Sequence, residues 1–305
     1  MDNRIKKRLA DLSERCGSNI LFDEPLWRYS SVGIGGNAAI LYLPGSSEEL
    51  KEARKCIGET GVPTVVLGKG SNVLVGDGGV DGVVIKLSKG CFETVNVKNE
   101  TVTAGAGVHL GKLITRCAEE GLSGLEGLIG IPATVGGALK NNASYRSAIS
   151  ECLVKLSVMD AAGNIRWIEQ NELEFGYRSL FLDPVDIILE AVFSFDRSSK
   201  EDLVDKIKAH FKAKRKKQPL EKKTLGCVFK NPQYGDMSAG RMIEASGMKG
   251  EVLGGTKVSE KHANFIVNIG NATALDYMSL MEVVKNAVKN EFSVELDPEI
   301  EIFGN

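Results

Sequence analysis

The sequence predicts an α+β fold in three parts, and three observations support this prediction. Short runs rich in Val, Ile and Leu alternate with segments of helical periodicity, which is the pattern of a mixed fold. Two glycine-dense loops, Gly68–Asn72 and Gly130–Ala138, lie between apolar runs. The character of the chain then changes at Lys200–Lys217, a basic helix that ends before Pro219 and links one domain to the next. The predicted parts are residues 1–85, 86–199 and 200–305.

The elements of the first two parts follow from local patterns. Ser46 and Glu49 form a capping box ahead of a helical stripe that runs up to Gly61. A second helix is predicted over Leu110–Glu120, and Ala162–Asn164 is a hairpin turn between two strands. The predicted strands are Thr64–Leu67, Gly82–Leu87, Thr101–Gly107 with its closing turn, Leu153–Val158, Ile165–Ile168 and Ile187–Phe195.

The last part is predicted to run strand, helix, strand, helix, strand. These elements are Gly226–Lys230, Met237–Ala245, Asn264–Asn268, Ala274–Glu291 and Val294–Ile302. In the final strand, alternation places Glu299 and Glu301 on one face, opposite Ile300 and Ile302. This acidic pair is either functional or simply a solvated face.

Bulk properties exclude several classes of protein. The 305-residue chain has a net charge of −2, which indicates neither a nucleic-acid-binding nor a membrane-surface protein. It contains no run of 18 apolar residues, and Met1–Arg8 lacks the apolar core of a signal peptide. The six cysteines form no C-x-x-C pair and the three histidines have no metal-ligand spacing. We therefore expect a cytoplasmic protein with reduced thiols and without a metal site.

Both glycine loops are candidates for binding a large phosphate-containing cofactor. Consecutive N–H groups with little side-chain bulk can converge on a pyrophosphate, although a tight turn is the alternative for either loop. The first loop is not a Walker A motif, because Gly70 follows Lys69 and Pro63 stands where the leading glycine belongs. Gly33–Ala38 matches G-x-G-x-x-A, but a strand rather than a helix is expected after it, which argues against a Rossmann fingerprint.

Arg178 and Cys227 are the first candidates for chemistry. Arg178 follows Gly176 and an aromatic residue, and a guanidinium can hold a carboxylate through two parallel hydrogen bonds. A surface arginine is the alternative. Cys227 lies on a predicted strand, where its thiol can donate a proton if neighbouring charges tune its pKa. A small hydrophobic core residue is the alternative there.

Three further polar residues belong to the same group of candidates. Lys217 ends the basic run, which is either a solvated helix end or a clamp for a diphosphate. Asn231 directly precedes Pro232 at the end of the strand that carries Cys227. His262 leads into an apolar strand and is either a structural histidine or a ligand contact.

Taken together and in this order, the segments resemble the family of UDP-N-acetylenolpyruvoylglucosamine reductases, also called UDP-N-acetylmuramate dehydrogenases. These are the flavoenzymes of bacterial peptidoglycan precursor synthesis. The resemblance extends from about Trp27 to Gly304, and the segment from Tyr177 to Cys227 has no obvious insertion, which is similar to the shorter, type II form. The motifs that carry it are Leu67–Leu74, Gly121–Glu126, Gly130–Ala138, Phe175–Ser179, Gly226–Pro232, Lys261–Asn268 and Asp297–Gly304.

The resemblance implies a two-subdomain FAD-binding fold of the vanillyl-alcohol oxidase type, followed by a C-terminal α/β domain that closes over a UDP-sugar. FAD would be held non-covalently, and NADPH would reduce it before the flavin N5 passes hydride to the enolpyruvyl β-carbon. A monomer is implied. The implied cofactor-binding residues are Gly68, Lys69, Gly70, Ser71, Asn72, Thr134, Val135, Gly136 and Gly137.

The resemblance also assigns roles to the polar candidates. Arg178 and Glu299 would bind and polarise the substrate carboxylate. Glu299 could do so only when protonated or by hydrogen bonding through a neighbour, so we expect its pKa to be raised. Cys227 occupies the general-acid position, where the family usually has Ser, and would protonate the α-carbon on the face opposite the flavin. The implied substrate-binding residues are Tyr177, Lys217, Asn231 and His262.

The sequence departs from the family pattern at several positions. Ala133 stands where the family usually has Gly, Gly33 replaces a common Arg, and Glu301 stands where many members place an Arg near the flavin. The stretch Asn142–Tyr145 is also less glycine-rich than usual. These departures concern FAD affinity more than the reaction. They leave two alternatives: another flavin oxidoreductase of this fold, or a non-catalytic protein that binds nucleotide sugars.

Overall fold

The computed structural model describes residues 19–58, 61–233 and 236–304, together with Lys7, Ala10 and Glu14. The described chain forms two compact units and passes between them five times. Unit 1 comprises residues up to Phe22, Ala39–Lys69 and Gly82–Ala213, and unit 2 comprises Asp23–Ala38, Gly70–Asp81 and Lys214–Asn305. The division into parts of residues 1–85, 86–199 and 200–305 stays a prediction. Apart from Lys7, the residues Met1–Arg8 lie outside the described part.

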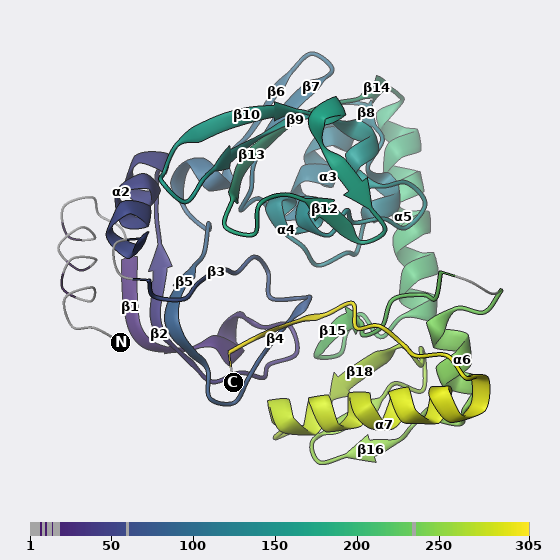
Figure 1. Ribbon diagram of the computed structural model, residues 1–305. Coiled ribbons are helices and arrows are strands. Elements are labelled where there is room, and N and C mark those ends of the chain that lie inside the picture. The colour runs from purple at the N-terminus through teal and green to yellow at the C-terminus, as the bar shows by residue number, and fades with distance from the viewer. Residues whose placement is uncertain are drawn as a thin grey trace. The chain divides into compact units, whose positions relative to one another are not determined.

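Unit 1 is built on an antiparallel sheet with strand order β10-β9-β13-β7-β6 (Figure 1). Helix α4 packs against the central strands β7 and β13, and α3 contributes Leu113, Ile114 and Cys117 to the same apolar core. The bounds are β6 Val95–Lys98, β7 Thr101–Gly105, β9 Leu153–Met159, β10 Ile165–Glu169, β13 Ile187–Ser194, α3 Leu110–Glu119 and α4 Val135–Lys140.

A second sheet, which lies mainly in unit 1, has strand order β1-β2-β5-β3. Strands β3 and β5 run parallel, so that Val66 pairs with Ile85 and both strands end at the same edge. The bounds are β1 Asn19–Pro25, β2 Asn37–Leu43, β3 Thr64–Val66, β5 Val80–Ile85 and the accompanying helix α2 Ser47–Gly58. Because β2 begins at Asn37, within the Gly33–Ala38 match, that segment is not the start of a Rossmann helix.

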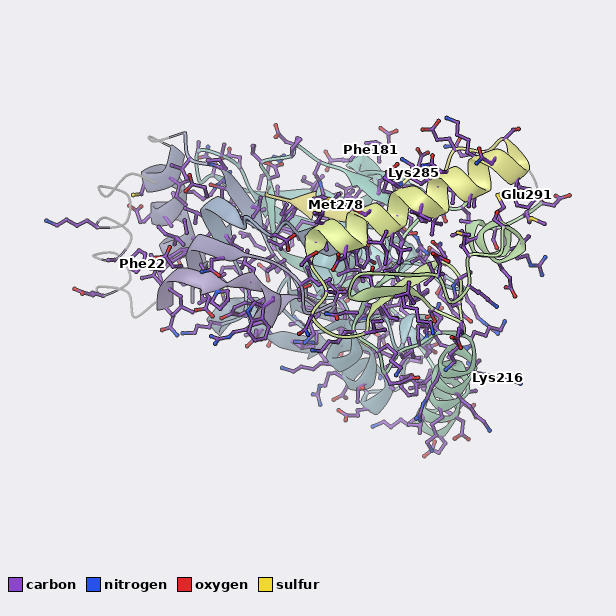
Figure 2. The ribbon with its side chains drawn as sticks, turned by 90° about the horizontal axis from the view of Figure 1, so that it is seen from below. Phe22, Phe181, Lys216, Met278, Lys285 and Glu291 are labelled. Carbon is purple, nitrogen blue, oxygen red and sulfur yellow. The ribbon has the colours of Figure 1, made fainter. Side chains whose placement is uncertain are left out.

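Unit 2 has its own apolar core between helices and a sheet of strand order β15-β18-β17-β16. The long helix α7 buries one face at helical spacing, including Tyr277, Leu280, Met281 and Val284, while Lys285 pairs with Glu282 outside that face (Figures 1 and 2). The bounds are β15 Thr224–Cys227, β16 Val252–Leu253, β17 Thr256–Val258, β18 Phe265–Asn268, α6 Ala239–Ala245 and α7 Ala274–Phe292.

Two distant segments of unit 2 form a separate parallel pair. Strand β4, Val73–Val75, pairs with β19, Glu301–Phe303, with Val73 opposite Glu301. The remaining elements are short apart from α5. They are β8 Leu122–Ser123, β11 Glu174–Gly176, β12 Ser179–Phe181, β14 Asp196–Arg197, α5 Lys200–Lys217 and the 3-10 helices Leu26–Tyr29, Gly90–Glu93, Glu126–Leu128, Ile149–Cys152 and Gln170–Glu172.

The structure confirms the mixed α+β class and corrects some boundaries. The helix over Lys200–Lys217 and the turn at Ala162–Asn164 are confirmed. The predicted strand Gly226–Lys230 ends instead at Cys227, because Gly226 has a φ of +82° and the pairing register shifts there. The predicted helix start at Met237 is also wrong, since Ser238 caps α6 by accepting a hydrogen bond from Arg241.

The predicted final strand is wrong over most of its length. Strand β19 begins only at Glu301, so Glu299 is not part of it. The expected alternation fails as well, because Ile300 is 5% exposed whereas Ile302 is 48% exposed. The segment before Glu301 is instead hydrogen-bonded to the chain that follows Cys227. These bonds prevent it from forming one continuous strand with β19.

Within the described residues, none of the helices has the length and apolar character that crossing a bilayer requires. In the same part of the chain, His, Cys, Asp and Glu side chains form no cluster suited to a metal ion. The five described cysteines are free thiols, and Cys56 and Cys117 are buried on α2 and α3.

Candidate active site

The first glycine loop presents a run of main-chain donors. The N–H groups of Gly68, Lys69, Gly70 and Ser71 have no acceptor among the residues that the structure describes. The loop follows β3, leads into β4, and passes from unit 1 into unit 2 between Lys69 and Gly70. Successive amides without acceptors, with a left-handed residue among them, are typical of a loop that binds an anion.

Gly70 fixes the conformation of this loop. It is buried, its φ is +64°, and a Cβ atom there would collide with the carbonyl oxygen of Tyr29. The Gly70 carbonyl accepts two hydrogen bonds from Ser31, at 2.8 Å from the main-chain nitrogen and 2.9 Å from Oγ. Only glycine fits this position without displacing the loop.

The second glycine loop is different, because its amides are already used inside the protein. Val135 N donates to Val108 O at 2.8 Å, Gly136 N donates to Ala106 O at 2.9 Å, and Gly137 N donates to Thr134 Oγ1 at 3.3 Å. The expectation that this loop offers bare amides to an anion is therefore wrong for these three residues. Their contact with a cofactor stays a prediction.

The two loops nevertheless meet in unit 1. A Cβ atom on Gly68 would lie 2.8 Å from Thr134 Oγ1, so the first loop passes directly over the N-cap of α4. Ala133, which replaces the usual glycine, has no positive φ, so the alanine does not strain the second loop.

Arg178 lies at the tip of the hairpin formed by β11 and β12. Its φ is +59°, a left-handed conformation that is uncommon for a non-glycine residue. Its Nη1 donates to the carbonyl oxygen of Ser144 at 3.0 Å and to Ser144 Oγ at 2.9 Å. Asn142 Nδ2 donates to Gly176 O at 3.2 Å and so holds the base of the same turn. Tyr177 is 51% exposed, and its ring centroid lies 5.6 Å from the Arg178 guanidinium carbon.

In unit 2, the chain after Cys227 is held from two sides. The buried Asn264 side chain accepts from Phe229 N at 2.9 Å and donates to Phe229 O at 2.8 Å. On the other side, Glu299 N donates to Val228 O at 2.7 Å, and Lys230 N donates to Asp297 O at 2.8 Å. Glu299 is therefore bonded to the residue that follows the half-buried Cys227.

Glu299 is also joined to the first glycine loop. Asn72 Nδ2 donates to Glu299 O at 3.1 Å, and Glu301 N donates to Asn72 O at 2.9 Å. Three of the predicted site residues, Asn72, Cys227 and Glu299, are thus brought together within unit 2. Arg178 belongs to unit 1.

The remaining candidates lie at three places in unit 2. Asn231 Oδ1 accepts from Ala239 N at 3.1 Å, at the start of α6. His262 stacks edge-on against Phe265 with ring centroids 4.8 Å apart, and burial, followed by Lys249, lowers its pKa, so the imidazole is neutral at pH 7. Lys217 is exposed at the end of α5. In contrast, Lys214 of the same basic run is buried, so that run is not a uniformly solvated face.

The residues around the first loop fit an anionic cofactor that carries a diphosphate. The run of donors at Gly68–Ser71 has no protein acceptor among the described residues, and the absence of side chains at Gly68 and Gly70 is required by close contacts. A diphosphate supplies acceptors for such donors, whereas in a simple tight turn only water would supply them.

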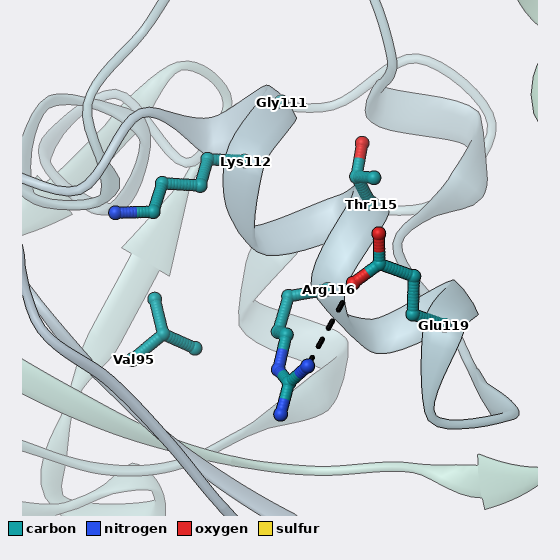
Figure 3. A pocket seen from close by; sticks show the side chains of 6 residues that line it. All are labelled: Val95, Gly111, Lys112, Thr115, Arg116 and Glu119. Atoms are coloured by element: carbon teal, nitrogen blue, oxygen red, sulfur yellow. Dashed lines mark ion pairs between the residues drawn. The ribbon is translucent and has the colours of Figure 1, made fainter.

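A separate pocket of about 540 Å³ opens beside α3 and β6 (Figure 3). It is lined by Val95, Gly111, Lys112, Thr115, Arg116 and Glu119. Arg116 and Glu119 form an ion pair of 3.7 Å along one turn of α3. None of the predicted site residues lines this pocket, so it does not belong to the candidate active site.

Sequence reasoning did not single out Ser144 or Asn264, which hold the segments that carry Arg178 and Cys227. Ser144 lies in the stretch that departs from the usual Asn-Ala-Gly-Ala pattern, and that departure was the available signal. Asn264 is a buried amide at the start of an apolar strand. A polar residue in that position signals a structural hydrogen bond.

Comparisons with known proteins found relatives that match nearly the whole chain. Residues 218–303 match the model of the UDP-N-acetylenolpyruvoylglucosamine reductase C-terminal domain, and residues 38–169 match an FAD-binding domain. The UDP-N-acetylenolpyruvoylglucosamine reductase of Halalkalibacterium halodurans is 41% identical over 286 residues, covering 92% of this chain and 93% of the relative. That of Bacillus subtilis is 36% identical over 303 residues, covering 98% and 99%.

A solved structure is similar over nearly the same length. The crystal structure of UDP-N-acetylenolpyruvylglucosamine reductase from Thermus caldophilus superimposes with a TM-score of 0.81 at 38% sequence identity. The similarity covers 94% of this chain and 99% of that chain.

Proposed function

The chain belongs to the family of UDP-N-acetylenolpyruvoylglucosamine reductases, and we propose that it reduces UDP-N-acetylglucosamine-enolpyruvate to UDP-N-acetylmuramate with non-covalent FAD and NADPH. It is therefore an oxidoreductase of peptidoglycan precursor synthesis, the pathway on which cell-wall formation, cell shape and division depend. The observation that best supports the cofactor is the run of amides at Gly68–Ser71 without a protein acceptor. The matched FAD-binding domain includes this loop.

The first loop would hold the FAD diphosphate through the amides of Gly68, Lys69, Gly70 and Ser71. Asn72 would be the last cofactor-binding residue of this loop. Thr134, Val135, Gly136 and Gly137 would border the cofactor, and the last three would do so without donating their amides, which are already used inside the protein. When bound, FAD supplies to the substrate the hydride that it has received from NADPH. Neither loop contains a His or Cys that could attach the flavin covalently, which supports non-covalent binding.

The chemistry at the substrate rests on three residues. Arg178 would hold the carboxylate, towards which negative charge shifts as hydride adds to the double bond. Glu299 would share this task only if its carboxyl group is protonated, so a raised pKa is part of the proposal. The Cys227 thiol would deliver the proton to the α-carbon, and a thiol is more acidic than the serine hydroxyl usual in the family.

The substrate would be positioned by residues around these groups. We assign Tyr177, Asn231 and His262 to contacts with the UDP-sugar and Lys217 to its diphosphate. The exposed tip that carries Tyr177 and the neutral His262 are compatible with such contacts. We further propose a monomer of the shorter, type II form that works in the reducing cytoplasm, as the free thiols favour.

The test is direct. The purified protein should be yellow, with flavin absorption near 450 nm, and addition of UDP-N-acetylglucosamine-enolpyruvate should trigger NADPH oxidation. A colourless protein that cannot be reconstituted with FAD would contradict the proposal. Tight UDP-sugar binding without flavin would select a non-catalytic binding protein instead, and flavin reoxidation by oxygen without a response to the UDP-sugar would select a different oxidoreductase.

A further inference from the structure

Lys86 is a partly buried lysine at the edge where the first glycine loop begins. It directly follows β5, and Gly68 lies two residues after the end of the parallel neighbour β3, so the two strand ends bring these residues together. The Lys86 ammonium donates a hydrogen bond to the carbonyl oxygen of Gly68. Its main-chain N–H is fixed as well, by donating to Tyr42 O at 2.9 Å.

Other basic groups surround the same place in unit 1. Burial first, and then the nearby Lys69, lowers the pKa of Lys86 to about 8. Burial, Lys69 and Lys86 lower the pKa of His109 in turn. His109 pairs across an isolated bridge with Thr134, whose hydroxyl lies against Gly68. The nearby Glu93 carboxylate acts in the opposite direction, because its negative charge raises the pKa of both Lys86 and His109.

An anion that binds next to these basic groups would stabilise the arrangement. A lysine loses hydration when it is buried, and neighbouring like charge adds repulsion, so the folded chain carries a cost here. A diphosphate that accepts hydrogen bonds from the N–H groups of Gly68 and Lys69 would bring negative charge next to the side chains of Lys69 and Lys86. An ammonium group has three N–H donors, so one can hold the Gly68 carbonyl while another reaches a phosphate oxygen.

We propose that Lys86 is a cofactor-binding residue that anchors the first glycine loop through the Gly68 carbonyl and supplies positive charge to the diphosphate of bound FAD, with His109 lining the same site. This inference rests on the proposed function, because it takes the ligand of the loop to be FAD. It adds to the loop amides a side chain that lies outside the sequence motif. Since Lys86 needs its proton for this role, the affinity for FAD depends on pH.

The experiment measures the dissociation constant of FAD from the flavin-free protein by fluorescence quenching. Lys86→Met should raise this constant at least tenfold, Lys86→Arg should keep it within about threefold, and Lys98→Met on the exposed end of β6 should leave it unchanged. The dissociation constant of UDP-N-acetylglucosamine should not change in any of these variants. His109→Asn should weaken FAD binding by a smaller factor than Lys86→Met.

A pH series gives a second readout that does not depend on Lys86→Met folding. In the wild type, the dissociation constant of FAD should rise above pH 8 as Lys86 loses its proton, whereas Lys86→Arg should not show this rise. The other titrating groups that face Lys86, namely Lys69, Glu93 and His109, are the same in both proteins. Parallel pH profiles would overturn the inference.

The possible failures are distinguishable. A wild-type protein that binds no FAD would overturn the proposed function and this inference with it. FAD affinity that is equal in the wild type and Lys86→Met would overturn the inference alone. Weakened binding of the UDP-sugar with unchanged FAD affinity would assign Lys86 to the substrate diphosphate and overturn its assignment to the cofactor.

Discussion

Arg178 adopts a left-handed backbone conformation that costs an L-residue about 1 to 2 kcal/mol, and the hairpin retains it. Ser144 and Asn142 tether the hairpin tip through three hydrogen bonds. Strain that the surroundings hold in place is a feature of binding and catalytic turns. The orientation of this guanidinium is therefore set by a neighbouring loop as well as by its own rotamer.

Removing the Ser144 hydroxyl tests this tether. Ser144→Ala removes one of two acceptors from a charged donor, a loss of about 1.5 kcal/mol, so KM for the enolpyruvyl substrate should rise about tenfold with a smaller change in kcat. Ser144→Thr should restore most of the affinity. Ser147→Ala in the same loop is the control, and an equal effect of that variant on KM would show that the loop acts only through folding.

The proton-donor role of Cys227 is tested by two substitutions. Cys227→Ala should nearly abolish turnover, while Cys227→Ser should keep part of it, because a hydroxyl can still donate a proton. Steady-state NADPH oxidation measures both, with Cys91→Ala at an exposed cysteine as the control. Full activity of Cys227→Ala would remove the general-acid role.

At the scale of elements, the conformation of the first glycine loop depends more on Gly70 than on the number of glycines in the loop. Gly70 and Gly61 have nearly the same positive φ, +64° and +65°, but only Gly70 is crowded by another segment. The pair therefore separates the effect of backbone conformation from the effect of close packing.

We expect Gly61→Ala to lower the free energy of unfolding by about 1 kcal/mol without affecting FAD affinity. Gly70→Ala should cost more, because the new Cβ meets the Tyr29 carbonyl, and it should weaken FAD binding at least tenfold. Denaturant unfolding and FAD titration measure the two effects. Similar losses in both variants would mean that the loop tolerates displacement.

Local patterns predicted much of the fold, and tertiary contacts account for what they missed. The basic helix Lys200–Lys217 and the hairpin turn Ala162–Asn164 could be predicted because capping, periodicity and turn preferences depend on residues that are close together in the sequence. The false strand at Val294–Ile302 arose because its apolar residues look strand-like. The backbone groups of Asp297, Glu299 and Glu301 in this segment are bonded instead to Lys230, Val228 and Asn72, far away in the sequence.

The candidate site shows the same limit. The glycine loop Gly68–Asn72 was recognisable because its composition alone permits close approach to a ligand. That the amides of Val135 and Gly136 are already used could not be read from the sequence, because their acceptors, Val108 O and Ala106 O, lie in the segment that follows β7. Lys86 was missed for a related reason: its position beside Gly68 depends on the parallel register of β3 and β5.

At the scale of the whole molecule, Lys86 links stability to pH. Its pKa is about 8 in the folded flavin-free protein and 10.5 when unfolded. Below pH 8 both states carry the proton. Between pH 8 and 10.5 the unfolded state binds more protons, so the free energy of unfolding should rise with pH in this window, by about 1 to 3 kcal/mol.

The measurement compares flavin-free wild type with Lys86→Met in denaturant unfolding, so that the other titrating groups largely cancel. The difference between their unfolding free energies should be constant below pH 8 and should shift in favour of the wild type from pH 8 to pH 10. A constant difference over the whole range would show that Lys86 titrates normally.

The pairing of β4 with β19 has a consequence for how the chain acquires its structure during synthesis. Asn72 and Glu299 are bonded across 227 residues of sequence, and the neighbouring strands pair in register with them. Strand β4, which follows the first glycine loop, therefore cannot pair with β19 until nearly the whole chain has left the ribosome. Closing so long a loop is slow, so the first glycine loop should be among the last features to form, and a ribosome-stalled chain ending before Glu299 should not retain flavin.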